Sequence, residues 1–319
     1  MQPILLDTMQ QITDTILMIR PVAFRMNEET AVNNYFQEDI DARNFDINTK
    51  AQEEFDAFVA KLRAVGVQVI VEHDDLKMDT PDSIFPNNWV SFHENGIVGL
   101  YPMFAENRRR ERREEIMTRL ESEGFHIEGF MDYTPAEDED FFLEGTGSLL
   151  LDRVNKIAYC ALSPRADEDL FIEFCEDFEY TPIIFTANQT VDGKRLPIYH
   201  TNVMMALAED FAIICLDSID DPKEKKQVVS ALKQSKKEII AITEAQVHQF
   251  AGNMLQVRGT DSKYLVMSLA AHNSLAPSQI KQIEKHCEIL SSDLKTIETC
   301  GGGSARCMMA EVFLPKAKE

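Results

Sequence analysis

The chain has 319 residues, of which 54 are acidic and 32 are basic, and this gives a formal net charge of −22 at pH 7. Such a balance argues against nucleic acid and anionic membrane surfaces as partners, because both are bound by clustered Lys and Arg. It favours a cationic or zwitterionic small molecule, and the length allows one large domain or two with a sizeable core.

The cysteines and the N-terminus indicate the compartment. Six cysteines occur without a CxxC pair or a regular spacing, so neither a disulfide framework nor a zinc site is expected. The N-terminus lacks a basic region followed by a long apolar run, and no stretch of eighteen apolar residues predicts a membrane span. We therefore expect a cytoplasmic protein in a reducing environment, without a metal or cofactor.

Strand and helix patterns alternate along the whole chain. The sequence predicts a strand at 16–20, a helix at 49–65 and a strand at 67–72. Four longer units follow, each with a hairpin, a helix and a third strand. Local signals support them: Asn95-Gly96 is a strong hairpin turn, and Pro222 suits the first residue of a helix. In chain order the three parts of each unit lie at 89–103, 107–124 and 125–133; at 148–162, 166–178 and 182–186; at 203–216, 222–235 and 238–242; and at 254–270, 277–287 and near Leu290, before a last strand at 307–314.

One polar residue stands at the start of each hairpin and of the last strand. These residues are Asn88, Glu144, His200, Asn253 and Cys307, with spacings of 56, 56, 53 and 54 residues. The period predicts an α/β fold of five ββαβ repeats, in which the N- and C-terminal segments complete the last repeat. If the two ends of the chain complete the last repeat, the five repeats would form a closed ring and bring the five residues to one central axis. The alternative is that α/β chains alternate their elements anyway, and that the period is fortuitous.

The segment 301–304 (GGGS) holds three of the thirteen glycines of the chain, and Cys307 follows it closely. Glycine lets the backbone approach a ligand, and a thiol just beyond such a run is placed like a nucleophile. The alternative is a flexible turn before an edge strand, with Cys307 buried as a small hydrophobic residue.

Convergence at the axis would bring a thiol, an imidazole and a carboxylate together. Cys307 would attack as a thiolate, His200 would act as general acid and base, and Glu144 would orient the imidazole. The alternatives are that His200 is an exposed residue or a core residue whose hydrogen bonds are satisfied, and that Glu144 is a solvated surface residue. No residues with metal-ligand spacing accompany the three, so the predicted chemistry needs no metal.

Three segments resemble one known superfamily. They are 142–147 (FLEGTG), 199–202 (YHTN) and 301–308 (GGGSARCM). Together they are similar to the guanidine-modifying enzymes: the arginine deiminases, dimethylarginine hydrolases, succinylarginine dihydrolases and amidinotransferases. The resemblance covers nearly the whole chain and implies a single catalytic domain, 1–319, with the five-bladed β/α propeller called the pentein fold.

Further segments imply substrate-binding residues. The segment PDSIF resembles an early substrate-binding segment of the dimethylarginine hydrolases, and by that resemblance Asp82 would contact the substrate α-amino group. The segment ALSPR resembles one whose arginine binds the substrate carboxylate, which gives Arg165 that role. The three arginines 108–110 resemble a basic segment near the site, and Arg109 is favoured among them. Residues 26–35 are a candidate lid.

Two positions depart from the deiminase pattern. Where deiminases hold the guanidinium between two acidic residues, this chain has Asn88 and Asn202. A guanidinium carries only donors and suits carboxylates, whereas an amide offers both an acceptor and donors and suits a neutral ureido group. A mismatch would leave buried groups unpaired, at about 1–3 kcal/mol each. The sequence therefore favours a citrulline-like amino acid as the small-molecule substrate.

By resemblance, the chain is closest to the citrulline utilisation hydrolases. This implies conversion of citrulline to ornithine, ammonia and carbon dioxide through a covalent Cys307 intermediate. The alternatives are a hydrolase of arginine, N-acylarginine or dimethylarginine, an amidinotransferase, and a catalytically silent propeller that sequesters an amino acid. The sequence makes no prediction of the oligomeric state.

Overall fold

Five three-stranded sheets with one common strand pattern form the framework of the fold. The computed structural model describes residues 9–38 and 44–317. In each of these sheets the middle strand pairs antiparallel with one neighbour and parallel with the other. The parallel pair requires a crossover connection, which is usually helical. The predicted mixed α/β repeat is thus present.

The strands group as follows within the described residues. Written with the middle strand second, the sheets are β3 (Val90–Phe92), β4 (Ile97–Leu100) and β5 (Gly129–Asp132); β6 (Leu149–Asp152), β7 (Ile157–Leu162) and β8 (Thr181–Thr186); β11 (Met205–Leu207), β12 (Phe211–Ile214) and β13 (Glu238–Ala241); β14 (Leu255–Arg258), β15 (Lys263–Ser268) and β16 (Glu288–Ser292); and β17 (Ala310–Glu311), β1 (Thr15–Arg20) and β2 (Gln68–His73). A separate hairpin is formed by β9 (Asn188–Val191) and β10 (Lys194–Pro197).

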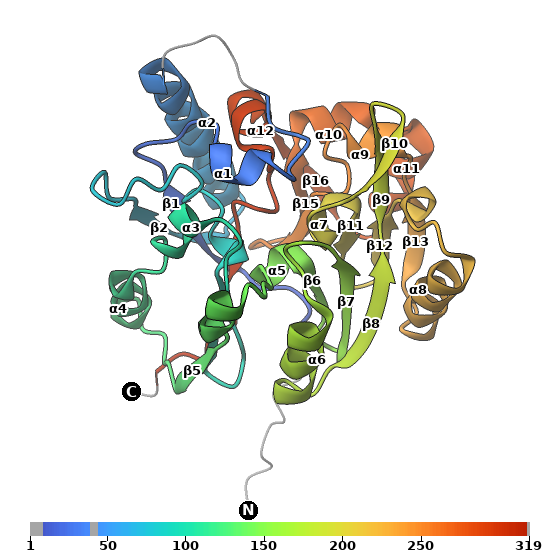
Figure 1. Ribbon diagram of the computed structural model, residues 1–319, viewed down its shortest axis with the longest axis horizontal. Helices are drawn as coiled ribbons and strands as arrows, with labels where there is room; N and C mark the ends of the chain where they lie inside the picture. Colours follow the sequence, from blue (N-terminus) through green and yellow to red (C-terminus); the bar gives the residue numbers. More distant parts are fainter. Residues whose placement is uncertain (1–8, 39–43, 318–319) are drawn as a thin grey trace, which may run out of the picture.

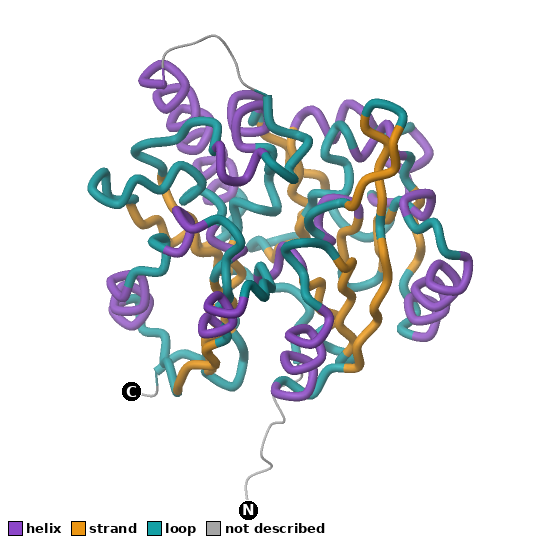
Figure 2. The backbone as a smooth tube through the Cα atoms, viewed as in Figure 1, coloured by secondary structure: helices purple, strands orange, loops and turns teal. Residues whose placement is uncertain are grey.

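The larger helices lie on the outside of the molecule, around the sheets (Figure 1). In chain order the helices are α1 (Glu28–Ala31), α2 (Asn44–Ala64), α3 (Glu106–Arg109), α4 (Glu114–Ser122), α5 (Gly145–Ser148), α6 (Glu168–Asp177), α7 (Thr201–Met204), α8 (Pro222–Gln234), α9 (Glu244–Val247), α10 (Leu269–Ser274), α11 (Pro277–Ile283) and α12 (Lys295–Gly301). Short 3₁₀ turns are η1 (Pro86–Asn88), η2 (Thr134–Glu139) and η3 (Leu216–Ser218). Loops fill much of the centre of the view (Figure 2).

Helix α8 illustrates why these segments fold as predicted. The Asp221 side chain caps its first turn by accepting from the backbone N–H groups of residues 223 and 224, and Pro222 begins the helix. The buried residues Val228, Ala231 and Leu232 recur at the helical spacing and face the sheet, while the remaining face is charged.

The two ends of the chain meet in one sheet. Strand β17 pairs antiparallel with β1 through Ile16 opposite Glu311 and Leu17 opposite Ala310, and β2 pairs parallel with β1. The pairing of the predicted strands 307–314 and 16–20 is therefore present. It joins the segment that carries Cys307 to the start of the fold.

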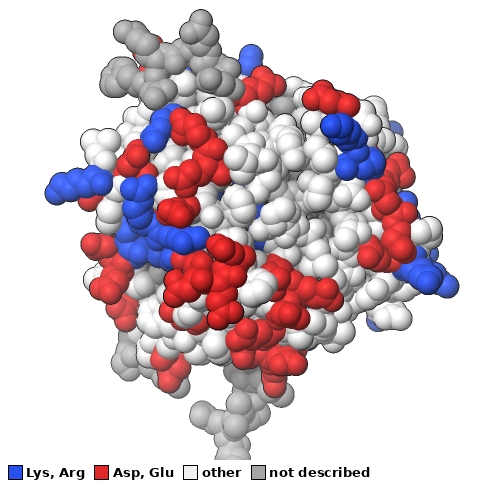
Figure 3. Space-filling model, in the orientation of Figure 1, with Lys and Arg blue, Asp and Glu red and all other residues white. Residues whose placement is uncertain are grey.

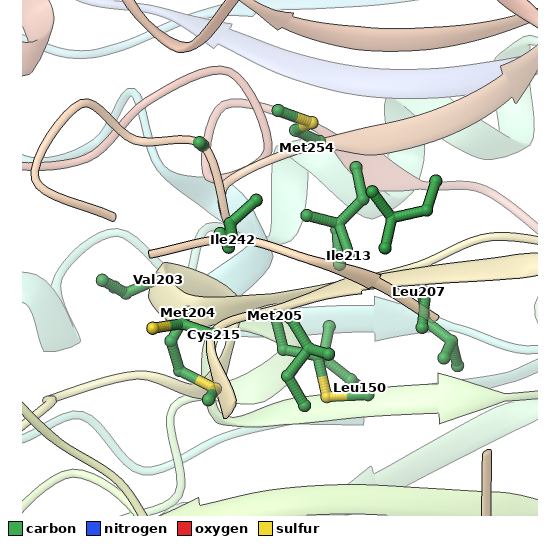
Figure 4. Packing of buried hydrophobic residues seen from close by; sticks show 14 of the residues in the cluster. Leu150, Val203, Met204, Met205, Leu207, Ile213, Cys215, Ile242 and Met254 are labelled. Carbon is green, nitrogen blue, oxygen red and sulfur yellow. The ribbon is translucent and has the colours of Figure 1, made fainter. Parts of the chain in front are cut away.

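The largest apolar cluster spans neighbouring sheets. Leu150 of β6, Met205 of β11, Ile213 of β12 and Met254 beside β14 pack together, with Met204 and Cys215 nearby (Figure 4). Burying each large apolar side chain contributes roughly 1.5–3 kcal/mol. This packing holds the strand ends that carry the polar residues in fixed relative positions.

The structure departs from the predicted elements at several places. The helix predicted at 107–124 is broken into α3 and α4, and the buried Arg108 of α3 pairs with the buried Glu111, which lies between the two helices. The hairpin β9–β10 was not predicted, although it turns at Asp192-Gly193 with positive φ at both residues. The glycine run does not form a loose turn, since α12 ends within it.

The surface is acidic, in keeping with the composition. Figure 3 shows one face, on which Asp and Glu side chains gather beside a largely uncharged centre, with Lys and Arg side chains set among them. Within residues 9–38 and 44–317, no helix combines the length and apolar character needed to cross a bilayer.

Candidate active site

A small, narrow cavity brings several of the predicted polar residues together; Glu144, Asn202 and Arg109 are not among the residues that line it. Its walls come from loops and short helices that lie between the strands of different sheets, and from the segment 26–35. The lining residues are Asn34, Asp82, Phe85, Asn88, Arg108, Arg165, Tyr199, His200, Gly301, Gly303 and Cys307.

The glycine run is fixed in place beside the cavity. Helix α12 ends at Gly301 and is capped by Gly302, whose φ of +61 is left-handed, as expected at a helix C-terminus. A Cβ atom at Gly301 or Gly303 would lie 2.8–2.9 Å from the Phe85 ring. The Tyr199 hydroxyl donates to the Gly302 carbonyl at 2.6 Å. Close packing therefore requires these glycines, and the alternative of a flexible turn is wrong.

His200 and Glu144 form a buried pair. Each side chain belongs to the residue preceding a short helix, α7 and α5 respectively. Nε2 of His200 lies 2.7 Å from Oε2 of Glu144, while Oε1 of Glu144 accepts from the Phe104 N–H at 3.0 Å. Nη1 of Arg165 lies 3.5 Å from the same carboxylate. The carboxylate thus binds Nε2 of the imidazole ring and leaves Nδ1 as the ring nitrogen that Glu144 does not contact.

The charges of this pair follow from burial and from Arg165. Burial alone would raise the pKa of Glu144, but Arg165 and the bond to His200 lower it to about 2. Burial lowers the pKa of His200 to about 4, against the pull of Glu144. At neutral pH we therefore expect an ionised Glu144 beside a neutral imidazole, which is the form that can accept a proton.

Two amides approach the sulfur of Cys307. Nδ2 of Asn202 lies 3.6 Å from Sγ, and Nδ2 of Asn253 lies 3.2 Å from it. The period in the sequence identified Asn253 as one of the five spaced positions but gave it no chemical role. Cys307 itself is buried, at the end of the loop that follows the glycine run.

Asp82 presents an unpaired oxygen at the cavity wall. Its Oδ2 accepts from Nδ2 of Asn27 at 2.8 Å and from Oγ1 of Thr30 at 3.1 Å. Its Oδ1 is buried and has no hydrogen-bond partner among the described residues. Burial raises the pKa of Asp82, against the charges of Arg108 and Arg165. A cationic group entering the cavity would find an acceptor here.

Arg165 connects the cavity to the predicted lid. Its Nη2 donates to the Thr30 carbonyl at 2.9 Å, and its Nε donates to Oδ1 of Asn33 at 2.8 Å. Its guanidinium also lies 4.9 Å from the ring centroid of Tyr199. The segment 26–35 therefore lies over the cavity and contacts two of its charged residues, since Asn27 and Thr30 also bind Asp82.

The structure corrects the choice among the three arginines. Arg108, not Arg109, lines the cavity: it is buried, donates from Nη1 to Oδ1 of Asn88 at 2.7 Å, and pairs with Glu111 at 2.9 Å. Arg109 turns away, and its Nε donates to the Met103 carbonyl. The three are consecutive on a short helix, so the inward position depends on the helix rotation, which the buried partner Glu111 sets. The acidic residue three positions after Arg108 was the available indication in the sequence.

A second buried carboxylate stands behind the glycine run and predicts a pH effect. Oε1 of Glu298 accepts from the Ser304 hydroxyl at 2.6 Å, and burial raises the pKa of Glu298 to about 7 from 4.5. Since the folded-state pKa lies above the unfolded value, the stabilisation is full below about pH 4.5 and is lost as the pH rises through 7. Glu298→Gln should therefore raise the free energy of unfolding at pH 8 by up to about 3 kcal/mol, with little effect at pH 4.5.

Urea unfolding at pH 4.5 and pH 8 measures this effect. The exposed residue Glu284 provides a control, because Glu284→Gln should change the free energy of unfolding little at either pH. An equal gain from Glu298→Gln at both pH values would contradict the prediction.

No group of three or more His, Cys, Asp or Glu side chains in the described part of the chain is arranged to hold a metal ion. The arrangement at the cavity instead combines a thiol, a neutral imidazole oriented by a carboxylate, and separate cationic and anionic groups. This is the combination needed for nucleophilic attack on a planar carbon, followed by proton transfer to a leaving group.

Comparison with known proteins identifies relatives of the chain. A family model described as N,N dimethylarginine dimethylhydrolase, eukaryotic, matches residues 20–314. No curated protein matches the chain.

Three solved structures are similar in fold. The apo structure of ArgZ, an arginine dihydrolase from the ornithine–ammonia cycle in Cyanobacteria, has a TM-score of 0.72 at 16% identity, over 95% of this chain and 41% of that chain. The N-terminal domain of ArgZ with a covalently bound reaction intermediate has a TM-score of 0.69 at 17% identity, over 94% and 99%. A dimethylarginine dimethylaminohydrolase adduct with S-methyl-L-thiocitrulline has a TM-score of 0.62 at 14% identity, over 94% and 99%.

The chain thus spans about two fifths of full-length ArgZ and nearly all of its N-terminal domain. At these identities, the likeness shows that the chain shares the mixed α/β fold of these enzymes.

Proposed function

The chain belongs to the N,N-dimethylarginine dimethylhydrolase family, eukaryotic type, and on that basis we propose that it is a cysteine-dependent hydrolase of an arginine-related amino acid, with the ureido carbon of citrulline as its target. The observation that carries the proposal is that Cys307 and His200 line one cavity and that Glu144 binds His200. The three residues lie far apart in the sequence, each a few residues before a strand of a different sheet. Sequestering an amino acid would need none of the three.

The proposed reaction has two stages. His200 first takes the proton of the Cys307 thiol on Nδ1, and the thiolate attacks the ureido carbon. The imidazolium then returns this proton to the leaving nitrogen as the tetrahedral adduct expels ammonia. This leaves a carbamoyl thioester on Cys307. His200 then removes a proton from water, which attacks the same carbon and releases the thiolate. The product, ornithine carbamate, loses carbon dioxide to give ornithine.

Glu144 keeps the imidazole ready for both proton transfers. Because it accepts from Nε2 of His200, the proton that moves is carried by Nδ1. The N–H groups of the glycine run are candidates for stabilising the oxygen of the tetrahedral adduct, since Gly301 and Gly303 line the cavity.

A neutral substrate group is favoured by the contacts of Asn88. Its Oδ1 accepts from the buried Arg108 and its Nδ2 donates to Oδ1 of Asn87 at 3.1 Å, so one amide hydrogen is left for a substrate. Burial opposes the charge on Arg108, but Glu111 holds the pKa of Arg108 above its usual value. A guanidinium would meet a donor and a neighbouring cation, whereas a ureido oxygen would accept from the amide.

The amino-acid end of the substrate would be bound by opposite charges. The unpaired Oδ1 of Asp82 suits an α-ammonium group, and the guanidinium of Arg165 suits an α-carboxylate. Both residues contact the segment 26–35, which would close over the bound amino acid.

Two further proposals concern the architecture. The five sheets are proposed to be blades around one axis, as in the five-bladed propeller, because each supplies one of the five spaced polar residues. Residues 1–319 are proposed to act as a single catalytic domain, because the first and last strands share one sheet.

A second candidate function follows from the family itself. The family description names dimethylarginine, and ArgZ is named an arginine dihydrolase. The purified protein should be assayed with citrulline, arginine, N-acylarginine and dimethylarginine. Ammonia and ornithine are measured for every substrate, and dimethylamine and citrulline are measured as well for dimethylarginine. We expect equal amounts of ammonia and ornithine from citrulline. Two ammonia molecules per ornithine from arginine would instead favour a dihydrolase, and turnover of dimethylarginine alone would favour the family reaction.

A single substitution tests the role of the amides in substrate choice. Asn202→Asp removes the amide donor beside Cys307 and adds a carboxylate, which suits a guanidinium and repels a ureido oxygen. We expect the ratio of kcat/KM for citrulline to that for arginine to fall by about 10- to 100-fold. Because one variant is assayed on two substrates, a general loss of activity cancels in the ratio. An unchanged ratio would remove Asn202 from substrate selection.

A further inference from the structure

A short turn delivers Asn253 to Cys307. Phe250 in this turn has φ +60, in the left-handed region that a bulky residue rarely adopts. At Gly252 a Cβ atom would lie 2.2 Å from the Val203 carbonyl oxygen, so another residue would fit only if the backbone shifted. Strained backbone of this kind persists where the surrounding structure holds it, and it concentrates at functional sites.

The amide of Asn253 is held in one orientation. Its Oδ1 accepts from the backbone N–H groups of Arg306 at 3.0 Å and Cys307 at 3.4 Å. Its Nδ2 donates to the Asn202 carbonyl at 3.1 Å and to Sγ of Cys307 at 3.2 Å. A flipped amide would turn its NH₂ group toward two donors and its oxygen toward a carbonyl, and would lose every one of these bonds. One amide hydrogen is therefore aimed at the sulfur.

The second amide near the sulfur is held less tightly. Nδ2 of Asn202 lies 3.6 Å from Sγ and 3.5 Å from the Thr146 carbonyl, and its Oδ1 lies 3.9 Å from Sγ. These distances are at the outer limit of hydrogen bonding. Both amides are buried, but only Asn253 has short hydrogen bonds at both its oxygen and its nitrogen.

We propose that Asn253 is a further catalytic residue, whose side-chain N–H group hydrogen-bonds to the sulfur of Cys307 and stabilises the attacking thiolate. This inference rests on the proposed function, in which Cys307 is the nucleophile. A hydrogen bond to a charged acceptor is about twice as strong as one to a neutral acceptor, so the bond favours the thiolate over the thiol. His200, whose Nε2 is engaged by Glu144, takes up the thiol proton on Nδ1, and the hydrogen bond from the Asn253 amide favours this transfer by stabilising the thiolate that it leaves.

Charged groups of the same cavity also act on the sulfur. The charged and titratable side chains that line it are those of Asp82, Arg108, Arg165, Tyr199 and His200. The two arginines favour a thiolate, and an ionised Asp82 opposes it. All five stay in place in the variants below, so a difference between variants reports on residue 253.

The test is the pH dependence of alkylation of Cys307 by iodoacetamide. The thiolate displaces iodide from the reagent, so the rate follows the thiolate fraction. Modification of Cys307 is followed by mass spectrometry of its peptide and compared with that of the other five cysteines. The proteins compared are the unaltered chain, Asn253→Asp, Asn253→Ala and Gln189→Glu. The last is a matched control, because Gln189 of β9 is a buried amide that does not contact the sulfur.

We expect the pH midpoint of Cys307 alkylation to rise by about one unit or more in Asn253→Asp, and by a smaller amount in Asn253→Ala. The rate at pH 7 should fall roughly tenfold in Asn253→Asp, together with kcat/KM. Gln189→Glu should keep the midpoint of the unaltered chain even if its melting temperature falls, which separates loss of the hydrogen bond from general destabilisation.

The outcomes distinguish this inference from the proposed function. An unchanged midpoint in both folded Asn253 variants would overturn the role of Asn253 while leaving Cys307 as the nucleophile. If Cys307 of the unaltered chain reacts no faster than the other cysteines and no substrate is turned over, the proposed function fails, and the inference fails with it.

Discussion

Cys307→Ser is expected to lower ammonia release from citrulline by at least about a thousandfold while the fold stays intact. Serine has nearly the same size and keeps the hydrogen bonds of the loop, but its hydroxyl is far less nucleophilic than a thiolate at neutral pH. The side chain is buried and touches two amides, so little rearrangement is expected. Ammonia release, thermal unfolding and a search for a covalent adduct by mass spectrometry measure the effect.

A matched control uses another buried cysteine. Cys287 precedes β16 and lies outside the cavity, and burial raises its pKa to about 11, so it is an unreactive thiol. Cys287→Ser should keep turnover close to that of the unaltered chain. Turnover by Cys307→Ser within about tenfold of that value would refute the covalent route.

Glu144→Gln should have the next largest effect, a loss of roughly a thousand- to ten-thousandfold in kcat. The amide oxygen would stay with the Phe104 N–H group, which needs an acceptor, so the NH₂ group would face His200. The ring would then have to carry its proton on Nδ1, and the nitrogen that accepts the proton would be lost. Arg165 would also lose its anionic partner inside the protein. Steady-state kinetics measure the loss.

Glu137 offers a control with similar contacts. It also accepts from a backbone N–H, that of Met103 at 2.7 Å, and pairs with an arginine, Arg112, but it touches no histidine. Glu137→Gln should lower the melting temperature with little change in kcat. Equal losses of kcat in both variants would mean that Glu144 acts through stability rather than through the orientation of His200.

The order of the strands and helices could be predicted from the sequence because it depends on local patterns, such as turn residues and the first residues of helices. Turn chemistry at Asn95-Gly96 and the start of α8 at Pro222 follow from neighbouring residues alone. The β9–β10 hairpin, which was not predicted, has the same kind of local indication at Asp192-Gly193.

Side-chain roles at the cavity were harder to predict, because they depend on contacts between distant segments. Which of three consecutive arginines faces inward depends on Glu111 and on Asn88, which lies on another element. The use of the Asn253 amide depends on two backbone donors of the Cys307 loop, 53 and 54 positions away. A single sequence gives the spacing of such residues but not the direction in which they point.

The pairing of the two ends of the chain has a consequence for the time at which activity can arise. The Thr13 hydroxyl donates to the Val312 carbonyl, 299 positions away, and β17 follows Cys307 by only a few residues. During synthesis the thiol of Cys307 therefore lacks its neighbours in the fold until β17 has been made and has paired with β1. Contacts of such long sequence separation form slowly, so we expect the sheets that form from local contacts to be in place before the cavity around Cys307 is complete.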